Sequence, residues 1–440
     1  MRNRYYIAAC LAIVTLGMIV VAFPEGAASL LVVLILSAAA IIIFRRYAEE
    51  KEFITTVFLG ALLVRLAFGV FIHSYDLRQF FGGDALTYDF NGWRLVEYWT
   101  SHIVTDDMAL QRAFSMTGPG WGMNYLVGGI YYLTGRNILA AQSFCAVFGA
   151  ATAPMVYFCA ARMFSNKRVA RMSAISVALF PSFIIWSSQL MKDGLIIFLL
   201  VLAMTMVLTL QEKFNYAALL LLIFAMFGIF SLRFYIFYMV VLAVGGSFIM
   251  GVTESIQSMA RRAAVLILLG IGLTYLGVIR NASLDFERFG SLERIQVSRQ
   301  DLAESAESGF GEDVDVSTPA GAISALPVGF LYLMFAPFPW EMTNFRQTIT
   351  LPEVLLWWAM MPFLVAGIVY AVRHRLRKSV PVLVFSLMLV LAYSIFQGNV
   401  GTAYRQRTQI QVFLFIFIAV GITLYLEGKE NKTLIRRSRF

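Results

Sequence analysis

Long apolar blocks are the feature that most restricts how this chain of 440 residues can fold. A helix needs roughly 20 residues to cross a hydrocarbon layer, and inside that layer the backbone must satisfy its own polar groups. Because 60% of the residues are hydrophobic and only 14% are charged, the composition excludes an ordinary soluble domain. We therefore expect an all-α, polytopic transmembrane helical bundle, formed as a single integral membrane domain over residues 1–440. About twelve spans are predicted, at 5–23, 27–44, 53–72, 138–160, 169–186, 191–210, 215–231, 234–251, 263–279, 351–372, 379–397 and 408–426.

Two further apolar stretches, 121–134 and 326–339, are too short and too rich in Gly, Pro or Trp to be predicted as spans. We expect them to be interfacial or re-entrant pieces, whose backbone is satisfied by neighbouring protein.

The positions of Lys and Arg predict the orientation, because short cytoplasmic loops hold positive charge. An N-terminus inside and twelve crossings place most of the 35 basic residues inside. The net charge of +9 is then a topology signal and an attraction to anionic lipid. No nucleic-acid motif is present. We expect a multi-pass plasma (inner) membrane protein with both termini cytoplasmic. The inside residues include Arg45, Arg46, Lys51, Arg162, Lys167, Arg168, Arg171, Lys213, Arg261, Arg262, Arg373, Arg375, Arg377 and Lys378.

Two large loops, 73–137 and 280–350, are predicted outside, so function is expected on that face. The first alternates aromatic and polar residues at helical spacing, which predicts short helices along the membrane surface. The second contains an acidic stretch at 285–315 that ends in a Gly/Ser/Pro-rich segment. That composition predicts a partly flexible lid.

Gly82-Gly83-Asp84, a few residues after the third predicted span, is the sharpest local feature. A carboxylate at the membrane boundary can act as a general base when partial desolvation raises its pKa. The alternative is that Asp84 only caps the next helix, since Asp is a preferred N-cap.

Arg65 interrupts the third span, and an ionisable residue inside the bilayer is a functional candidate by default. Its alternative role is to extend towards the outer headgroups. Lys192 and Asp193 open the sixth span on the same face. They form either a local ion pair at a helix start or a site that offers an ammonium group to a phosphate.

Arg405 and Arg407 open the last span from the outer side, where positive charge is disfavoured. Their compensating group is either the acidic loop or the phosphate of a ligand, which a guanidinium binds with fork geometry.

The order of short motifs resembles the GT-C class of membrane glycosyltransferases, especially bacterial enzymes that use polyprenyl-phosphate-linked sugars. The resemblance runs over about 60–205 and returns at 326–426. It rests on the Arg65 span, on Gly83-Asp84-Ala85-Leu86-Thr87-Tyr88, on Gly118-Pro119-Gly120-Trp121, on Phe180-Pro181-Ser182-Phe183 and on Lys192-Asp193-Gly194-Leu195.

The resemblance implies that Asp84 is the catalytic base and that Lys192 and Arg405 hold the phosphate of the donor lipid. Many members carry paired acids in the first loop, whereas Ala85 follows Asp84 here. The second carboxylate is then Asp89 or Asp193.

We predict transfer of a sugar from a polyprenyl-phosphate-linked donor to an envelope polysaccharide, lipid or protein acceptor on the outer face. Substrate-binding candidates are Arg65, Tyr88, Lys192, Arg405 and Arg407. A divalent cation (Mg²⁺ or Mn²⁺) could join carboxylates and phosphate, but no metal ligands are assigned. The three Cys and three His of the chain are too scattered for a metal cluster.

Two alternatives belong to other classes. An O-antigen-type polysaccharide polymerase or ligase would have a similar span count and outer arginines. A transporter or flippase would need charged residues near the bilayer midplane, where only Arg65 is found.

Overall fold

A computed structural model of the chain describes residues 25–81, 83–101, 120–249, 256–304, 308–311, 314–342 and 344–437, with isolated residues at 10, 13, 14, 17, 111 and 116. These residues form helices, and the β-type pairing recorded among them is an isolated bridge between Gly309 and Asn399. The elements are α2 (Glu25–Tyr47), α3 (Lys51–Ser74), α4 (Arg78–Phe81), α5 (Asp84–Ser101), α7 (Trp121–Thr134), α8 (Ile138–Phe164), α9 (Lys167–Leu179), α10 (Pro181–Ser187), α11 (Lys192–Glu212), α12 (Tyr216–Leu232), α13 (Phe234–Ile249), α14 (Ile256–Tyr275), α15 (Val278–Phe289), α16 (Leu292–Glu304), α17 (Pro319–Phe335), η1 (Pro339–Glu341), α18 (Phe345–Thr348), α19 (Leu351–His374), α20 (Leu376–Phe396) and α21 (Val400–Arg437).

Seven of the described helices, α2, α3, α8, α11, α19, α20 and α21, are long and apolar enough to cross a membrane. The number rises to nine if the bent pairs α9–α10 and α14–α15 each count as one span. Helices α12, α13 and α17 are apolar but shorter, and most of the predicted span 5–23 lies outside the described residues. The polytopic helical architecture is therefore confirmed, whereas the predicted count of about twelve is not.

The predicted span 169–186 is bent by 55° between α9 and α10. Pro181 lies at the bend as the first residue of α10, and Phe180 before it has an extended conformation with φ −69° and ψ 129°. Proline removes a backbone donor and disfavours the helical conformation of the residue before it. Local sequence chemistry therefore divides a continuous apolar block into two helices.

Asparagine side chains begin three of the helices. Asn137 accepts a hydrogen bond from the amide of Ala140 at the start of α8. Asn166 and Asn215 accept from the first free amides of α9 and α12 in the same way. An Asn cap satisfies donors that the first helical turn leaves unpaired, and so fixes where each helix starts.

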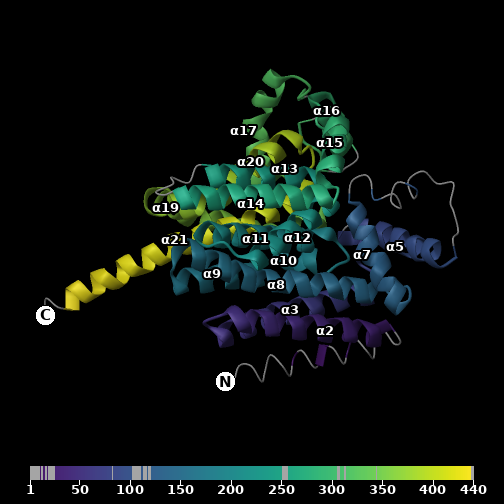
Figure 1. The fold of residues 1–440 in the computed structure, drawn as a ribbon, viewed down its shortest axis with the longest axis horizontal. Coiled ribbons are helices and arrows are strands. Elements are labelled where there is room, and N and C mark those ends of the chain that lie inside the picture. Colours follow the sequence, from purple (N-terminus) through teal and green to yellow (C-terminus); the bar gives the residue numbers. More distant parts are fainter. Residues whose placement is uncertain are drawn as a thin grey trace.

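Helices α8, α11 and α21 form the centre of the bundle. In α11, 83% of the apolar segment is buried inside the protein, against 22% in α2, which packs at the periphery. Helix α8 packs against α2, α3, α9 and α11, and α21 packs against α9, α11 and α19. Figure 1 shows these long helices lying side by side, with α5 and α7 at one end of the bundle.

The loops predicted to be cytoplasmic meet at the same end of the bundle, although they are far apart in the sequence. Glu50 accepts hydrogen bonds from Arg171 and from Tyr157, the latter at 2.7 Å. Glu212 pairs with Arg162 at 3.1 Å and with Lys378 at 2.9 Å. The structure is thus consistent with one shared side for these loops, and which side of a membrane this is stays a prediction.

The two loops predicted to be outside meet at the other end, where Phe80 of the first loop contacts Phe345 and Arg346 of the second. Helices α5 and α7 pack together within the first loop. In the second loop, α15 and α16 precede residues 308–311, which pair with the start of α21: the amide of Phe310 donates to Gly398 O at 2.8 Å, and the amide of Val400 donates to Ser308 O at 3.0 Å. Residues 305–307 and 312–313 of the predicted flexible lid lie outside the described residues. The described part of the second loop is tied directly to α21.

Candidate active site

Asp84 is the first residue of α5, and its carboxylate contacts α21. Arg405 Nη1 donates a hydrogen bond of 2.9 Å to Asp84 Oδ2. The Asp84 side chain is 45% exposed, whereas that of Arg405 is 18% exposed. A negative side chain is favourable at a helix start, but the recorded partner of this carboxylate is an arginine 321 residues away.

Arg405 joins Asp84 to a second carboxylate, Asp193. Asp193 is fully buried at the start of α11, and its Oδ2 lies 3.5 Å from Arg405 Nε. Its other oxygen, Oδ1, accepts a hydrogen bond of 2.9 Å from Arg233 Nη2. Asp84, Arg405, Asp193 and Arg233 therefore form a continuous ion-pair chain. Buried charges need such partners, since an uncompensated charge away from water is costly.

The sequence analysis missed Arg233, which separates α12 from α13. The predicted topology places this turn outside, where positive charge is disfavoured. The same argument that selects Arg405 therefore also applies to Arg233.

Lys192 and Tyr88 lie beside the ion-pair chain. The Lys192 ammonium is 5.9 Å from the centre of the Tyr88 ring. Burial raises the pKa of the Tyr88 hydroxyl, and the Asp84 and Asp193 carboxylates raise it further. Tyr88 therefore stays protonated at neutral pH and can donate a hydrogen bond.

Gly120 allows this arrangement. It precedes α7 with φ +79°, and a Cβ atom at this position would lie 3.1 Å from Lys192 Nζ. A side chain here would have to adopt a left-handed backbone conformation and press on the ammonium group at once.

Asp89 lies apart from this cluster. Tyr131 Oη donates a hydrogen bond of 2.7 Å to Asp89 Oδ1, and Arg136 Nη2 donates one of 2.6 Å to Asp89 Oδ2. These contacts connect α5 to the C-terminal end of α7 and to the residues that follow it. The structure thus groups Asp193, and not Asp89, with Asp84.

Arg65 and Arg407 also lie apart from the cluster. Arg65 is fully buried and donates to Ser187 Oγ at 2.8 Å and to the carbonyl oxygens of Ala61 and Ala178 at 3.0 Å. Arg407, also buried, donates to the carbonyl oxygens of Met334 and Ala336 at 3.0 and 2.8 Å. Their roles in substrate binding stay predictions, since the recorded hydrogen bonds of both guanidinium groups go to protein oxygens.

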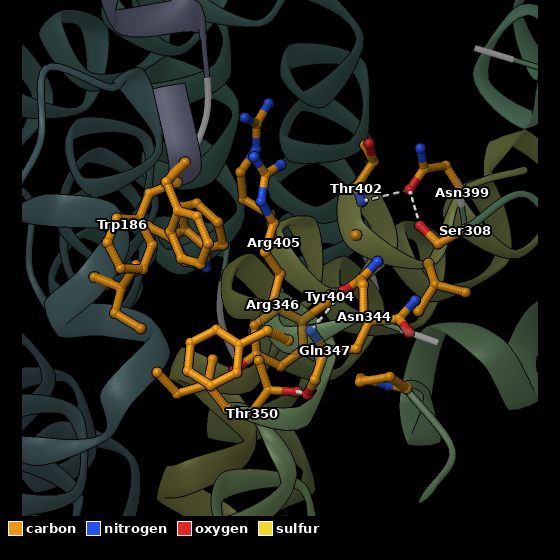
Figure 2. Close-up of a pocket in the computed structure, with 18 residues that line it drawn as sticks. Trp186, Ser308, Asn344, Arg346, Gln347, Thr350, Asn399, Thr402, Tyr404 and Arg405 are labelled. Carbon is orange, nitrogen blue, oxygen red and sulfur yellow. Dashed lines mark hydrogen bonds between the residues drawn. The ribbon is translucent and has the colours of Figure 1, made fainter. Parts of the chain in front are cut away.

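A cavity of about 740 Å³ opens beside Arg405. One part of its wall is apolar, with Phe80, Phe81 and Trp186, and another carries hydroxyl and amide groups. Figure 2 shows Trp186 on one side of the cavity and Asn399 with Ser308 on the other. The volume lies within the range of small-molecule sites, and the mixed wall suits a ligand with both apolar and polar parts. The lining residues are Phe80, Phe81, Ile185, Trp186, Ser308, Pro337, Asn344, Phe345, Arg346, Gln347, Ile349, Thr350, Asn399, Val400, Gly401, Thr402, Tyr404 and Arg405.

The residues of this site fit a protein-bound metal ion poorly. Among the described residues, no group of three or more His, Cys, Asp or Glu side chains is placed to hold one. Asp84 and Asp193 already share the guanidinium of Arg405, which lines the cavity. No catalytic step is therefore assigned to a divalent cation.

Helices of membrane-spanning length and a cation-rich site beside a ligand-sized cavity define a class of membrane proteins that can bind an anionic ligand. The sequence profile of the dolichyl-phosphate-mannose-protein mannosyltransferase family matches residues 61–280, which is half of the chain, and the chain belongs to this family. No curated protein sequence matches it. The family is a GT-C glycosyltransferase family, so the resemblance inferred from the sequence is confirmed. The protein is a membrane glycosyltransferase that uses a polyprenyl-phosphate-linked sugar.

The matched region contains Asp84, Tyr88, Lys192, Asp193 and Arg233. Arg405 and much of the cavity wall lie outside it. The candidate site is therefore completed by the C-terminal part of the chain.

Proposed function

We propose that this protein transfers the sugar to an envelope polysaccharide, lipid or protein acceptor on the outer face, with Asp84 as the general base. The observation that carries this proposal is the Asp84–Arg405–Asp193–Arg233 ion-pair chain beside the cavity. These ion pairs bring a partly exposed carboxylate and a guanidinium to the same place. Sugar transfer from a phosphate requires these two groups.

Asp84 and Asp193 have different roles in this proposal. Asp84 is 45% exposed, so an acceptor hydroxyl can reach its carboxylate and give up a proton to it. Asp193 is fully buried, accepts a hydrogen bond from Arg233 and forms an ion pair with Arg405. It acts as a positioning residue that orients Arg405.

The charges of the cluster match a phosphodiester. Lys192, Arg233 and Arg405 supply three positive charges, and Asp84 and Asp193 supply two negative charges, which leaves one positive charge. A sugar joined to a polyprenyl chain through one phosphate carries a single negative charge. Arg405, which both pairs with Asp84 and lines the cavity, is placed to bind that phosphate.

Exchange of Asp84 for Asn tests the proposal. Asn keeps the size of the side chain and its ability to start a helix but cannot accept the proton, so turnover should fall by about 100-fold or more. Turnover of a radiolabelled polyprenyl-phosphate sugar by purified, monodisperse protein measures this, with thermal unfolding as the check on folding.

Asp89→Asn is the matched control five residues away, since Asp89 pairs with Tyr131 and Arg136 outside the cluster. Its turnover should stay near that of the wild type when the protein is folded. Full activity of Asp84→Asn beside an inactive, folded Asp89→Asn would assign the base to Asp89 instead.

A further inference from the structure

Arg346, on the short helix α18, lines the same cavity as Arg405. Its side chain is exposed, and its recorded contact is with the Phe80 ring, whose centre is 4.9 Å from the guanidinium carbon. Among the described residues, Arg346 makes no hydrogen bond or ion pair. Its positive charge is therefore additional to that of the ion-paired cluster around Arg405.

Trp186, on α10, contributes a second donor to the cavity wall. Its indole Nε1 is buried and has no hydrogen-bond partner among the described residues. A buried N–H without an acceptor is costly, so an acceptor supplied by a ligand would stabilise this site. Figure 2 shows Trp186, Arg346 and Arg405 around the same space.

The reaction changes the charge of the phosphate. When the bond between the anomeric carbon and the phosphate oxygen breaks, its electron pair stays on that oxygen, while the acceptor oxygen forms the new bond and its proton goes to Asp84. The donor phosphodiester carries one negative charge, and the released monoester approaches two at neutral pH because its second pKa is about 6. Because Asp84 becomes neutral when it takes the proton of the acceptor, the net charge of the site stays the same. What changes is the place of the negative charge, which moves from the Asp84 carboxylate to the phosphate.

We propose that Arg346 and the indole N–H of Trp186 bind the departing polyprenyl phosphate and stabilise the negative charge that grows on it. This inference rests on the proposed function, because it takes the cavity as the site of the carrier phosphate. An interaction that is stronger with the developing charge than with the substrate accelerates the chemical step. Arg346 is then a catalytic residue supplied by the second outer loop.

Binding of two probes tests this assignment without knowledge of the sugar or the acceptor. The probes are a short-chain polyprenyl monophosphate, which resembles the product, and the corresponding polyprenyl methyl phosphate, which is a diester like the donor. Arg346→Gln should lower the affinity for the monophosphate by about tenfold, as expected for a lost charged hydrogen bond. It should lower the affinity for the methyl diester by less than about threefold. Trp186→Phe should also lower the affinity for the monophosphate.

Two further arms make the result specific. Arg294→Gln removes one charge from the same loop at a residue that does not line the cavity, and should change neither affinity. In the wild type, the preference for the monophosphate should grow between about pH 5 and about pH 7.5 as its second proton leaves. This growth should be smaller in Arg346→Gln and restored in Arg346→Lys.

Equal weakening of both probes by Arg346→Gln, or no weakening of either, would overturn the assignment. Failure of the proposed function gives a different pattern, because Arg405→Gln would then leave both probes bound as tightly as by the wild type.

Discussion

Five buried or largely buried arginines of the described residues divide into two groups according to what their guanidinium groups contact. Arg65, Arg299 and Arg407 each donate to backbone carbonyls near the C-terminal end of a helix, at Ala178, Gln397 and Met334 respectively. Carbonyls at helix ends lack intrahelical partners and carry partial negative charge, so a cation stabilises them. Arg233 and Arg405 instead pair with carboxylates at the candidate site. The first group holds helix ends in place, and the second lies at the candidate site, where we propose that the sugar is transferred.

Arg65→Gln should therefore act on stability rather than on substrate binding. The variant loses a charged group that makes hydrogen bonds to Ser187 and to three carbonyl oxygens. Breaking such a buried network should destabilise the protein by about 3 kcal/mol or more. Thermal unfolding in detergent measures this loss, and affinity for a polyprenyl phosphate should be unchanged in the folded fraction. A lower affinity at unchanged stability would favour the substrate-binding role that the sequence predicted.

At the scale of elements, helix α7 connects the first outer loop to the site. It begins after Gly120, with φ +79°, and ends before Gly135, with φ +72°. Only the first glycine approaches the site, because a Cβ at Gly120 would meet Lys192 Nζ at 3.1 Å, whereas a Cβ at Gly135 would have nothing within 4 Å. The two glycines that flank this helix thus share a positive φ but differ in ψ, which is 15° at Gly120 and 178° at Gly135, and in their surroundings.

Gly120→Ala and Gly135→Ala form a matched pair. Each forces an L-residue to a positive φ, in the left-handed region at Gly120 and with an extended ψ of 178° at Gly135. Such strain costs on the order of 1–3 kcal/mol, so thermal unfolding should occur at a lower temperature in both variants. Turnover and donor affinity should fall only in Gly120→Ala, since only there does the new methyl group displace Lys192. An equal loss of donor affinity in the two variants would show that α7 acts through backbone strain and not through Lys192.

At the scale of the whole molecule, the loops predicted to be cytoplasmic and those predicted to be outside occupy opposite ends of the bundle. At one end, Glu50 and Glu212 form hydrogen bonds and ion pairs with residues in or beside the basic loops. At the other end, residues 308–311 of the second outer loop pair with the start of α21. This separation agrees with the Lys/Arg asymmetry, and it requires that the candidate site face one compartment only.

Cysteine labelling tests which compartment that is. In a Cys10→Ser background, a Cys at Gln300 should react with a reagent that does not cross the membrane, because the second loop is predicted outside. Arg377→Cys should react only after the membrane is permeabilised. Protection of position 300 together with reaction at 377 in intact cells would invert the topology and place the proposed transfer on the cytoplasmic side.

The sequence alone determined the helical membrane architecture and most of the candidate site residues. Apolar blocks of span length are a local property, and Pro181, Gly120 and the Asn caps fix breaks and starts through their own chemistry. Asp84, Lys192 and Arg405 were selected because charge at an apolar boundary needs a reason. Apolar length did not determine the number of spans, since it does not reveal where a block bends or is too short once folded.

Only the tertiary structure decided which of these charged residues belong together. Arg405 and Arg407 are two positions apart, and at 3.6 residues per turn they point to faces about 160° apart. One therefore meets carboxylates and the other meets carbonyls. Asp84 and Asp89 lie on one helix and likewise have different partners, since Asp84 contacts Arg405 and Asp89 contacts Arg136. Arg233 belongs to the candidate site because its Nη2 lies 2.9 Å from Oδ1 of Asp193, a residue 40 positions away in the sequence. Such pairings depend on how distant helices pack, which no local pattern in the chain encodes.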